Sequence, residues 1–405
     1  MIHSFSCKNF YSFGDDLTTV SFVVNNIAPK TYGYFKALSG TRLSKIETVI
    51  GPNASGKTNL LKVVPFLKWL IIDSFNINPS AFIPVLPFIF YNYKNQPTEL
   101  SVEFEINKNI YIYNFSLTKT RILLEELRVK NKSKQKTTSK RIFYRLWNDK
   151  TNQYNFEGKN FNPPKGFNEN SLRSNASVIG VLMRLNHKQS QEISKFWQNV
   201  ETNVAEAGWI GDRLLPNATQ QLIETFKFYS ENSEIKNEAD KFLSTFDLGL
   251  DAIEILKKES EDGFSINVHG VHSFDTQNKN LDIRYESSGT KQLFVLLKTI
   301  LQVLASGGVA VLDEFDVNLH PEIVLSLFDL FVQPETNPNN AQLLFSTHSH
   351  LVLSKVDKYQ IIFVEKDKKG LSESWRMDEM SGIRADDNYY SKYIAGAYGA
   401  IPNIR

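Results

Sequence analysis

The sequence predicts an α/β fold with a parallel-sheet core, a preceding lobe of mixed β-structure and a helical insertion. Short apolar runs at 46–50, 309–312 and 343–345 have the length of buried parallel strands, and each runs directly into a glycine-containing or polar loop. Residues 97–147 alternate between apolar and polar types, as antiparallel strands do. Residues 172–246 instead repeat apolar side chains at helical spacing, which indicates the insertion.

Length and composition limit the class of protein. The chain has 405 residues, which fits about two to three domains, and its net charge of +2 gives no whole-molecule attraction to nucleic acid or membranes. Cys7 is the only cysteine, which excludes an internal disulfide and suits a reducing compartment. The apolar stretches Phe66–Ile72 and Ala81–Tyr91 are too short to cross a bilayer, and the N-terminus lacks a signal-peptide pattern. We therefore expect a cytoplasmic protein without a membrane partner.

The first lobe should consist of antiparallel strands around one strand–loop–helix unit. The turn signal Gly14-Asp15-Asp16 separates two strand candidates, and Pro65 should kink or restart the helix that follows the glycine loop. The elements expected here are strands at 1–13, 18–24, 46–50, 100–106, 110–117, 122–129 and 141–147, and a helix from residue 59.

A lysine-rich segment, residues 130–140, joins the last two of these strands. It holds five lysines and no acidic residue. Such a tip could contact nucleic acid phosphates or an acidic protein. Because no aromatic side chain is interleaved with the lysines, a solvated hairpin tip is the favoured interpretation.

The rest of the chain divides into an insertion and a second lobe. Residues 148–171 are polar and contain two adjacent prolines, as a linker does. The elements expected next are helices around 178–185, 193–200, 219–229 and 233–246, strands at 253–255, 264–268 and 281–285, a helix at 293–304, a strand at 309–312, a helix at 322–331, and strands at 343–345 and 361–364. We therefore predict an N-terminal lobe (1–150), a linker with helical insertion (151–250) and a C-terminal lobe (251–405).

The stretch Gly51–Thr58 fits the phosphate-binding pattern G-x-x-x-x-G-K-[S/T] at every fixed position. A strand before it and a helix after it would place several backbone N–H groups and a helix dipole around one anion. Lys57 should reach the β- and γ-phosphates of a nucleotide, and the Thr58 hydroxyl should lie on Mg²⁺. The candidate nucleotide-binding residues of this loop are Asn53, Ala54, Ser55, Gly56, Lys57, Thr58 and Asn59.

Two acidic residues follow the next buried strand. Asp313 should hold Mg²⁺, directly or through water, and Glu314 should orient and deprotonate an attacking water. An apolar strand that ends in an acidic turn is common by itself. Together with the phosphate loop it predicts a nucleotide hydrolysis site.

His348 and the pair Ser287 and Gly289 complete the candidate site. His348 follows a buried strand, where it could contact the γ-phosphate or the attacking water. Ser287 and Gly289 precede a helix and could form a second anion cradle. Since one chain needs only one such cradle, the second would act on the nucleotide of a neighbouring copy. The alternative for Ser287 is an ordinary helix cap.

These motifs, in this order, resemble the ABC-type ATPase superfamily and most closely its SMC/RecF/OLD-like branch. The resemblance implies a P-loop ABC-type ATPase head that binds ATP and Mg²⁺ and forms a homodimer or higher homo-oligomer with ATP sandwiched between copies. The matching segments are Gly51–Asn59 (Walker A), Ser287–Thr290 (signature), Leu312–Glu314 (Walker B), Asn318–Pro321 (D-loop) and Ser346–Ser349 (switch histidine). Two positions depart from the family pattern: Thr290 replaces a Gln or Glu, and Gln96 is only a candidate for the Q-loop glutamine.

The segments Lys8–Phe13 and Tyr398–Pro402 are similar to RloA-like AAA-family ATPases of bacterial anti-phage systems. Those of the PARIS and RloA type work with a separately encoded effector. Because about 40 residues follow the last core strand, too few for a TOPRIM nuclease domain, we expect any nuclease or toxin to be another polypeptide.

Three functions are compatible with these residues. The first is an ATP-hydrolysing switch of an anti-phage system that controls an effector and responds to DNA or a phage protein. The alternative is a RecF/SMC-like DNA repair or recombination ATPase that clamps DNA. A transporter ATPase subunit is disfavoured by the large insertion.

Overall fold

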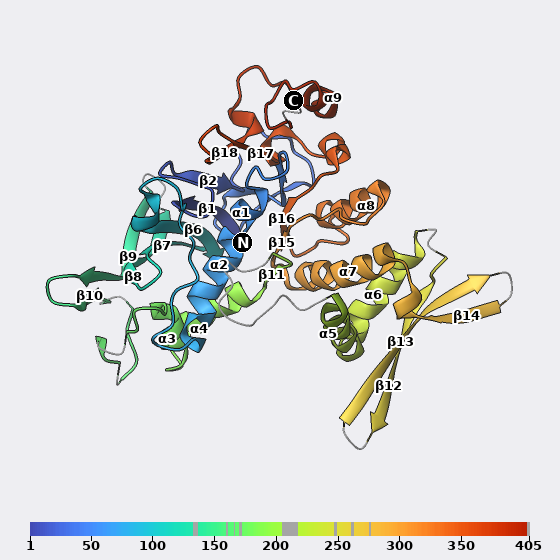
Figure 1. The fold of residues 1–405 in the computed structure, drawn as a ribbon, viewed down its shortest axis with the longest axis horizontal. Helices are drawn as coiled ribbons and strands as arrows, with labels where there is room; N and C mark the ends of the chain where they lie inside the picture. The colour runs from blue at the N-terminus through green and yellow to red at the C-terminus, as the bar shows by residue number, and fades with distance from the viewer. Residues whose placement is uncertain are drawn as a thin grey trace.

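The computed structural model describes residues 1–132, 137–158, 161–165, 167–169, 172–204, 218–246, 249–260, 263–274 and 277–402. Two large sheets form the body, and a three-stranded sheet projects from it beyond α5 and α6 (Figure 1). Of the lysine-rich segment 130–140, residues 133–136 lie outside the described residues, and the others belong to two paired antiparallel strands. No helix of the described part is long and apolar enough to pass through a bilayer.

The first large sheet is antiparallel throughout and has seven strands. The hairpin predicted at the N-terminus is confirmed, since its two strands pair from Ser4–Ser21 to Cys7–Thr18. In spatial order the strands are β10 (Gln153–Glu157), β9 (Thr137–Asn148), β8 (Ile122–Lys132), β7 (Asn109–Leu117), β6 (Thr98–Ile106), β1 (Ile2–Lys8) and β2 (Thr18–Ser21).

The second large sheet has six strands and is the predicted parallel core, with one antiparallel edge strand, β18. In spatial order the strands are β11 (Val200–Thr202), β15 (Val309–Leu312), β16 (Gln342–Ser346), β5 (Ile46–Ile50), β17 (Ile361–Lys366) and β18 (Ser372–Arg376). Two smaller antiparallel sheets contain β3 (Tyr34–Lys36) with β4 (Arg42–Ser44), and β12 (Ala252–Ser260) with β13 (Gly263–Phe274) and β14 (Gln277–Asp282).

Helices cover the six-stranded sheet and link it to the insertion. The α-helices are α1 (Lys57–Leu61), α2 (Val63–Lys68), α3 (Val178–Met183), α4 (Lys188–Gln198), α5 (Ala218–Glu231), α6 (Ser233–Ser244), α7 (Ser288–Ser306), α8 (Pro321–Val332) and α9 (Tyr389–Ile394). Short turns of π- or 3₁₀-helix are η1 (Trp69–Asp73), η2 (Ser74–Asn76), η3 (Tyr93–Asn95), η5 (Ile283–Tyr285), η6 (His350–Ser354), η7 (Lys358–Gln360) and η8 (Met377–Glu379). As predicted from Pro65, the first helix is interrupted, at Lys62, and α2 carries the proline in its first turn, where the missing N–H is tolerated.

The six-stranded sheet lies between two hydrophobic cores. On β5, Val49 faces one core, whereas Ile46 and Ile50 face the other, as the period of two in a strand requires. The first core contains the buried residues of α2, α3 and α4, and the second contains those of α5, α6, α7 and α8. The helical insertion is therefore divided between the two cores.

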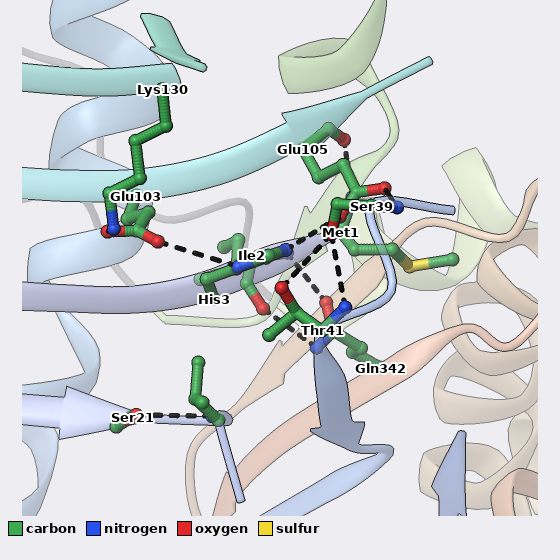
Figure 2. Close-up of polar contacts among 11 residues, drawn as sticks. Met1, Ile2, His3, Ser21, Ser39, Thr41, Glu103, Glu105, Lys130 and Gln342 are labelled. Atoms are coloured by element: carbon green, nitrogen blue, oxygen red, sulfur yellow. Dashed lines mark hydrogen bonds and ion pairs between the residues drawn. The ribbon is translucent and has the colours of Figure 1, made fainter. Parts of the chain in front are cut away.

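The two large sheets are joined at the start of β16 (Figure 2). The Gln342 side chain accepts a hydrogen bond from Ile2 N (2.7 Å) and donates one to Ile2 O (2.9 Å). Its amide thus makes with β1 the two hydrogen bonds that the backbone of a neighbouring strand would make. Close by, His3 Nε2 lies 2.9 Å from Glu105 Oε2 on β6. The Gln342 contacts fix the antiparallel lobe against the parallel core, whereas the His3–Glu105 contact joins β1 to β6 within that lobe.

Several expected elements differ from the structure. The supposed linker 148–171 contains β10, which extends the seven-stranded sheet. Val200 was expected at the end of a helix but begins β11. The strand expected at 281–285 ends at Asp282, and a 3₁₀ turn follows. β10 and β14 pair with the strand directly before them, and β11 pairs with the distant β15, so in each case the neighbouring strand decides the conformation, which a short local pattern does not reveal.

Candidate nucleotide site

The loops that carry the predicted site follow three adjacent parallel strands. β15 pairs with β16 up to Leu312–Phe345, and β16 pairs with β5 up to Ser346–Val49. The carboxyl ends of adjacent parallel strands meet at one edge of a sheet, which is where open α/β sheets bind their ligands. Fold topology alone thus brings Asp313, Lys57 and His348 to the same edge.

The loop between β5 and α1 has the backbone of an anion cradle. Ala54 and Gly56 both have positive φ, 62° and 116°. At Gly51 an added Cβ would lie 2.1 Å from Val364 O, and at Gly56 it would lie 2.3 Å from Ser372 Oγ, so both positions require glycine. The loop is therefore tightly wound at the N-terminus of α1, with Ser55 Oγ buried and making no hydrogen bond among the described residues.

Lys57 is folded onto its own loop. Its Nζ donates to Gly51 O (2.8 Å) and Pro52 O (3.1 Å). Burial lowers the pKa of Lys57, and the nearby carboxylates of Asp313 and Glu314 act in the opposite direction. A cation held at the mouth of the cradle, beside the Walker B carboxylates, fits a triphosphate with Mg²⁺.

Asp313 and Glu314 are oriented by the neighbouring strand β16. The Ser346 hydroxyl donates to Asp313 Oδ1, and its oxygen accepts from Glu314 N at 2.9 Å. Glu314 has φ 46°, a conformation that non-glycine residues adopt at an energetic cost and that clusters at functional sites. Its carboxylate is more than half exposed, so it can reach solvent water.

His348 lies next to Glu314. Its Nε2 is 4.0 Å from Glu314 Oε1, and its main-chain N–H donates to both Asp316 carboxylate oxygens at 3.1 Å. By contrast, His350 packs its ring against Tyr393, and burial with the charge of His348 lowers its pKa. His348 is thus the histidine that faces the acidic pair.

Ser287 caps α7. Its Oγ accepts from Thr290 N at 3.0 Å and lies 2.8 Å from Thr290 Oγ1. A Cβ on Gly289 would lie 2.7 Å from Asn318 O, so the signature segment packs on the D-loop segment of the same chain. The cap explains the helix start, and the second role predicted for Ser287 and Gly289, towards another copy, remains a prediction.

Of the other predicted residues, Thr58 and Asn59 lie in the first turn of α1, and Asn53 in the turn before it. The Asn59 side chain donates to Ser12 Oγ at 2.9 Å, which turns it towards the N-terminal hairpin. Gln96 lies in an exposed loop before β6, and its carbonyl accepts from Asn9.

Three polar residues at this edge were missed from the sequence. Asn203, just after β11, donates to Asp313 O (2.9 Å) and accepts from Asp313 N (2.7 Å). Ser12 and Ser372 lie behind the glycine loop. Asn203 and Ser372 are single polar residues far from any motif, and Ser12 lies in the segment Lys8–Phe13 without a nucleotide-site role being predicted for it.

Comparison with known proteins agrees with this geometry. Residues 48–354 match the family described as "AAA domain, putative AbiEii toxin, Type IV TA system". Because the match covers more than half of the chain, the protein belongs to this family of AAA domains. A comparison with curated protein sequences gives no match.

Among solved structures, the chain is similar to an SMC head bound to the C-winged helix domain of ScpA, with 15% identity, a TM-score of 0.50, and coverage of 93% of this chain and 99% of that one. Another similar structure is the SMC head domain from Thermotoga maritima, with 14% identity, a TM-score of 0.42, and coverage of 93% of this chain and 98% of that one. A third is the Smc head domain with a coiled coil and joint derived from Pyrococcus yayanosii, with 11% identity, a TM-score of 0.47, and coverage of 97% of this chain and 99% of that one. The fold is therefore an α/β P-loop ATPase head similar to SMC heads.

Proposed function

We propose that this protein binds ATP with Mg²⁺ and hydrolyses it to ADP and phosphate. The observation that carries the proposal is the convergence of Lys57, Asp313, Glu314 and His348 at one sheet edge, next to a glycine-lined anion cradle. Over the described residues there is no cluster of three or more metal-ligating side chains. This suits Mg²⁺, which is usually bound through one or two carboxylates and the substrate phosphates rather than by an all-protein cage.

Each residue then has a defined task. Lys57 would exchange its two loop carbonyls for β- and γ-phosphate oxygens, and Thr58 and Asp313 would hold Mg²⁺. Bound Mg²⁺ supplies positive charge next to the phosphate oxygens. Glu314 would orient the attacking water and accept its proton, a role that contributes about 10²–10⁴-fold in rate. His348, beside Glu314, would contact the γ-phosphate or that water.

We infer that two copies pack head to tail, with Ser287 and Gly289 of each facing the nucleotide of the other. Apolar side chains flank this surface without being buried. Tyr285 precedes the signature segment and is 74% exposed, Val317 in the turn before Asn318 is 38% exposed, and Leu351 after the switch histidine is 41% exposed. A partner copy that covered them would remove this apolar area from water.

The biological role that we propose is a cytoplasmic switch of a bacterial anti-phage system of the RloA or PARIS type, in which ATP controls a separately encoded effector. Two findings support it. The family description names a toxin of a toxin–antitoxin system, which is an arrangement of two components. The similar SMC head carries a domain of another protein, ScpA. A DNA-clamping ATPase is the alternative, and salt-dependent DNA binding lost on neutralising the lysines of 130–140 would favour it.

The test uses the full chain with two separate substitutions. Lys57→Ala should abolish ATP binding, because it removes the cation of the cradle. Glu314→Gln should retain ATP binding, lower turnover by about 10²-fold or more, and increase the ATP-dependent dimer seen by particle mass. Lys369→Ala, on the exposed turn between β17 and β18, is the control and should change neither property. Normal turnover in both site variants would disprove the assignment.

A further inference from the structure

A network of hydrogen-bonded side chains lies behind the phosphate loop. Two of its members, Ser12 and Ser372, lie outside the phosphate-loop motif. Asn59 Nδ2 lies 2.9 Å from Ser12 Oγ, Ser12 Oγ lies 2.7 Å from Ser372 Oγ, and Ser372 Oγ lies 2.6 Å from Ser55 O. Ser12 belongs to the turn after β1 and Ser372 begins β18. Both serines are more than nine-tenths buried, and Ser372 N also donates to Ser12 O at 2.8 Å.

Donor and acceptor capacity shows which side chain holds the Ser55 carbonyl. The Asn59 amide nitrogen can only donate, and the Ser55 carbonyl can only accept. Each serine hydroxyl has one hydrogen. The Ser372 hydroxyl faces two acceptors, Ser55 O and Ser12 Oγ, and its one hydrogen is shared between them, while Ser12 Oγ also accepts from Asn59. Since Ser55 O can only accept, the Ser372 hydroxyl is the side-chain group that holds it.

The last bond of the network, from Ser372 to Ser55 O, sets the orientation of one peptide group. In a planar trans peptide, the carbonyl and the following N–H point in opposite directions. When Ser372 holds Ser55 O behind the loop, Gly56 N–H must point to the other side, into the cradle. Gly56 itself has φ 116°, and a Cβ there would meet Ser372 Oγ at 2.3 Å and Ser12 Oγ at 2.9 Å, so nothing else separates the loop from the two serines.

We propose that Ser372 and Ser12 are positioning residues for phosphate binding, which act by locking the Ser55–Gly56 peptide with its N–H towards the nucleotide. The proposal rests on the ATP binding inferred above. It assigns a role in the nucleotide site to the turn after β1 and to the edge strand β18, which lie 360 positions apart in the chain.

The experiment measures equilibrium binding of ATP and ADP, steady-state turnover, and thermal unfolding without nucleotide. The variants are Ser372→Ala, Ser12→Ala and the control Ser374→Ala. Ser374 lies two residues further along β18, where its hydroxyl makes no hydrogen bond within the described part of the chain. Ser372→Ala should weaken ATP binding by about 10- to 100-fold, the usual worth of one hydrogen bond to a charged group. At saturating ATP, kcat should change by less than about 3-fold, because the catalytic side chains are not altered.

Two further results are specific to the mechanism. The loss should be the same for ATP and ADP, since the loop N–H groups cradle phosphates that both nucleotides share. Ser12→Ala should lose less affinity than Ser372→Ala, because Ser372 keeps its donated bond to Ser55 O. If Ser372→Ala does not fold, the equal loss of ATP and ADP in Ser12→Ala carries the test.

The outcomes separate this proposal from the function itself. If wild type and control bind ATP and Ser372→Ala binds it equally well, only the positioning role is wrong. A lower unfolding temperature with unchanged affinity, or a loss confined to ATP, overturns it in the same way. If the wild type binds neither nucleotide, ATP binding and the positioning role are both wrong.

Discussion

Asn203 offers a sharp test of how the Walker B carboxylate is held. β11 pairs with β15 in register as far as Thr202–Val311, and the Asn203 side chain then makes both hydrogen bonds to the Asp313 main chain, at 2.9 and 2.7 Å. Its amide thus continues the ladder by one residue. Replacing it with alanine leaves the carboxylate in place but releases the backbone that carries it.

The magnitude follows from these two bonds. Each is worth about 0.5–1.5 kcal/mol net, and both are exposed, so Asn203→Ala should cost about 1 kcal/mol of unfolding free energy or less. Turnover should suffer more, because a misplacement of about 1 Å can cost about 10²-fold in rate. We expect at least about tenfold slower ATP turnover at limiting Mg²⁺, with partial recovery at high Mg²⁺ since Asp313 is still present.

The assay is ATP turnover against Mg²⁺ concentration. The matched control is Gln302→Ala, because Gln302 Nε2 bonds Glu201 Oε1 at 3.1 Å and so also contacts β11 without touching Asp313. The control should keep the Mg²⁺ half-saturation of the wild type. An Asn203→Ala variant with unchanged half-saturation and unchanged kcat would refute the view that β11 positions the Walker B motif.

Three further predictions concern stability and reactivity. Burial raises the pKa of Glu47 well above 4.5, so the unfolded chain releases a proton that the folded chain keeps. The free energy of unfolding of Glu47→Gln, measured in urea, should therefore rise relative to that of wild type with increasing pH, by up to roughly 1.4 kcal/mol per pH unit. Glu373→Gln, at an exposed position, should show no such gain. Glu125→Ala should cost about 3–5 kcal/mol because it leaves buried Arg145 without its carboxylate, and joint replacement of the pair by leucine and methionine should cost less. Burial raises the pKa of the Cys7 thiol to about 12, so thiol labelling at neutral pH should occur only as fast as the chain unfolds, and rapid labelling of the native protein would contradict this.

What could be predicted from the sequence was local. The glycine loop is a contiguous motif, and the apolar run before Asp313 has the length and composition that identify a buried strand. Parallel strands then bring such loops together without further information, because their carboxyl ends share an edge. The sequence therefore predicted Lys57, Asp313 and His348 at one site before any geometry was known.

The residues that hold those motifs in place were not predictable. Ser12, Asn203 and Ser372 are single polar side chains in unremarkable surroundings, and their roles depend on partners 47 to 360 positions away. The short strands β10 and β11 were also not predicted. Each is an edge strand whose conformation is decided by its neighbour and not by its own composition.

The two end segments Lys8–Phe13 and Tyr398–Pro402 both pack on the sheet that carries the phosphate loop. Ser12, in the first segment, joins the hydrogen-bonded network behind that loop. In the second, Tyr398 packs against Phe363 of β17, and Ala400 N donates to Glu365 Oε2 at 2.7 Å. These segments therefore belong to the nucleotide lobe. If the protein controls an effector as proposed, the insertion should determine which effector it binds. Exchanging α5 and α6 with those of a relative should then change the partner without changing ATP affinity, and a partner unchanged by that exchange would contradict this division.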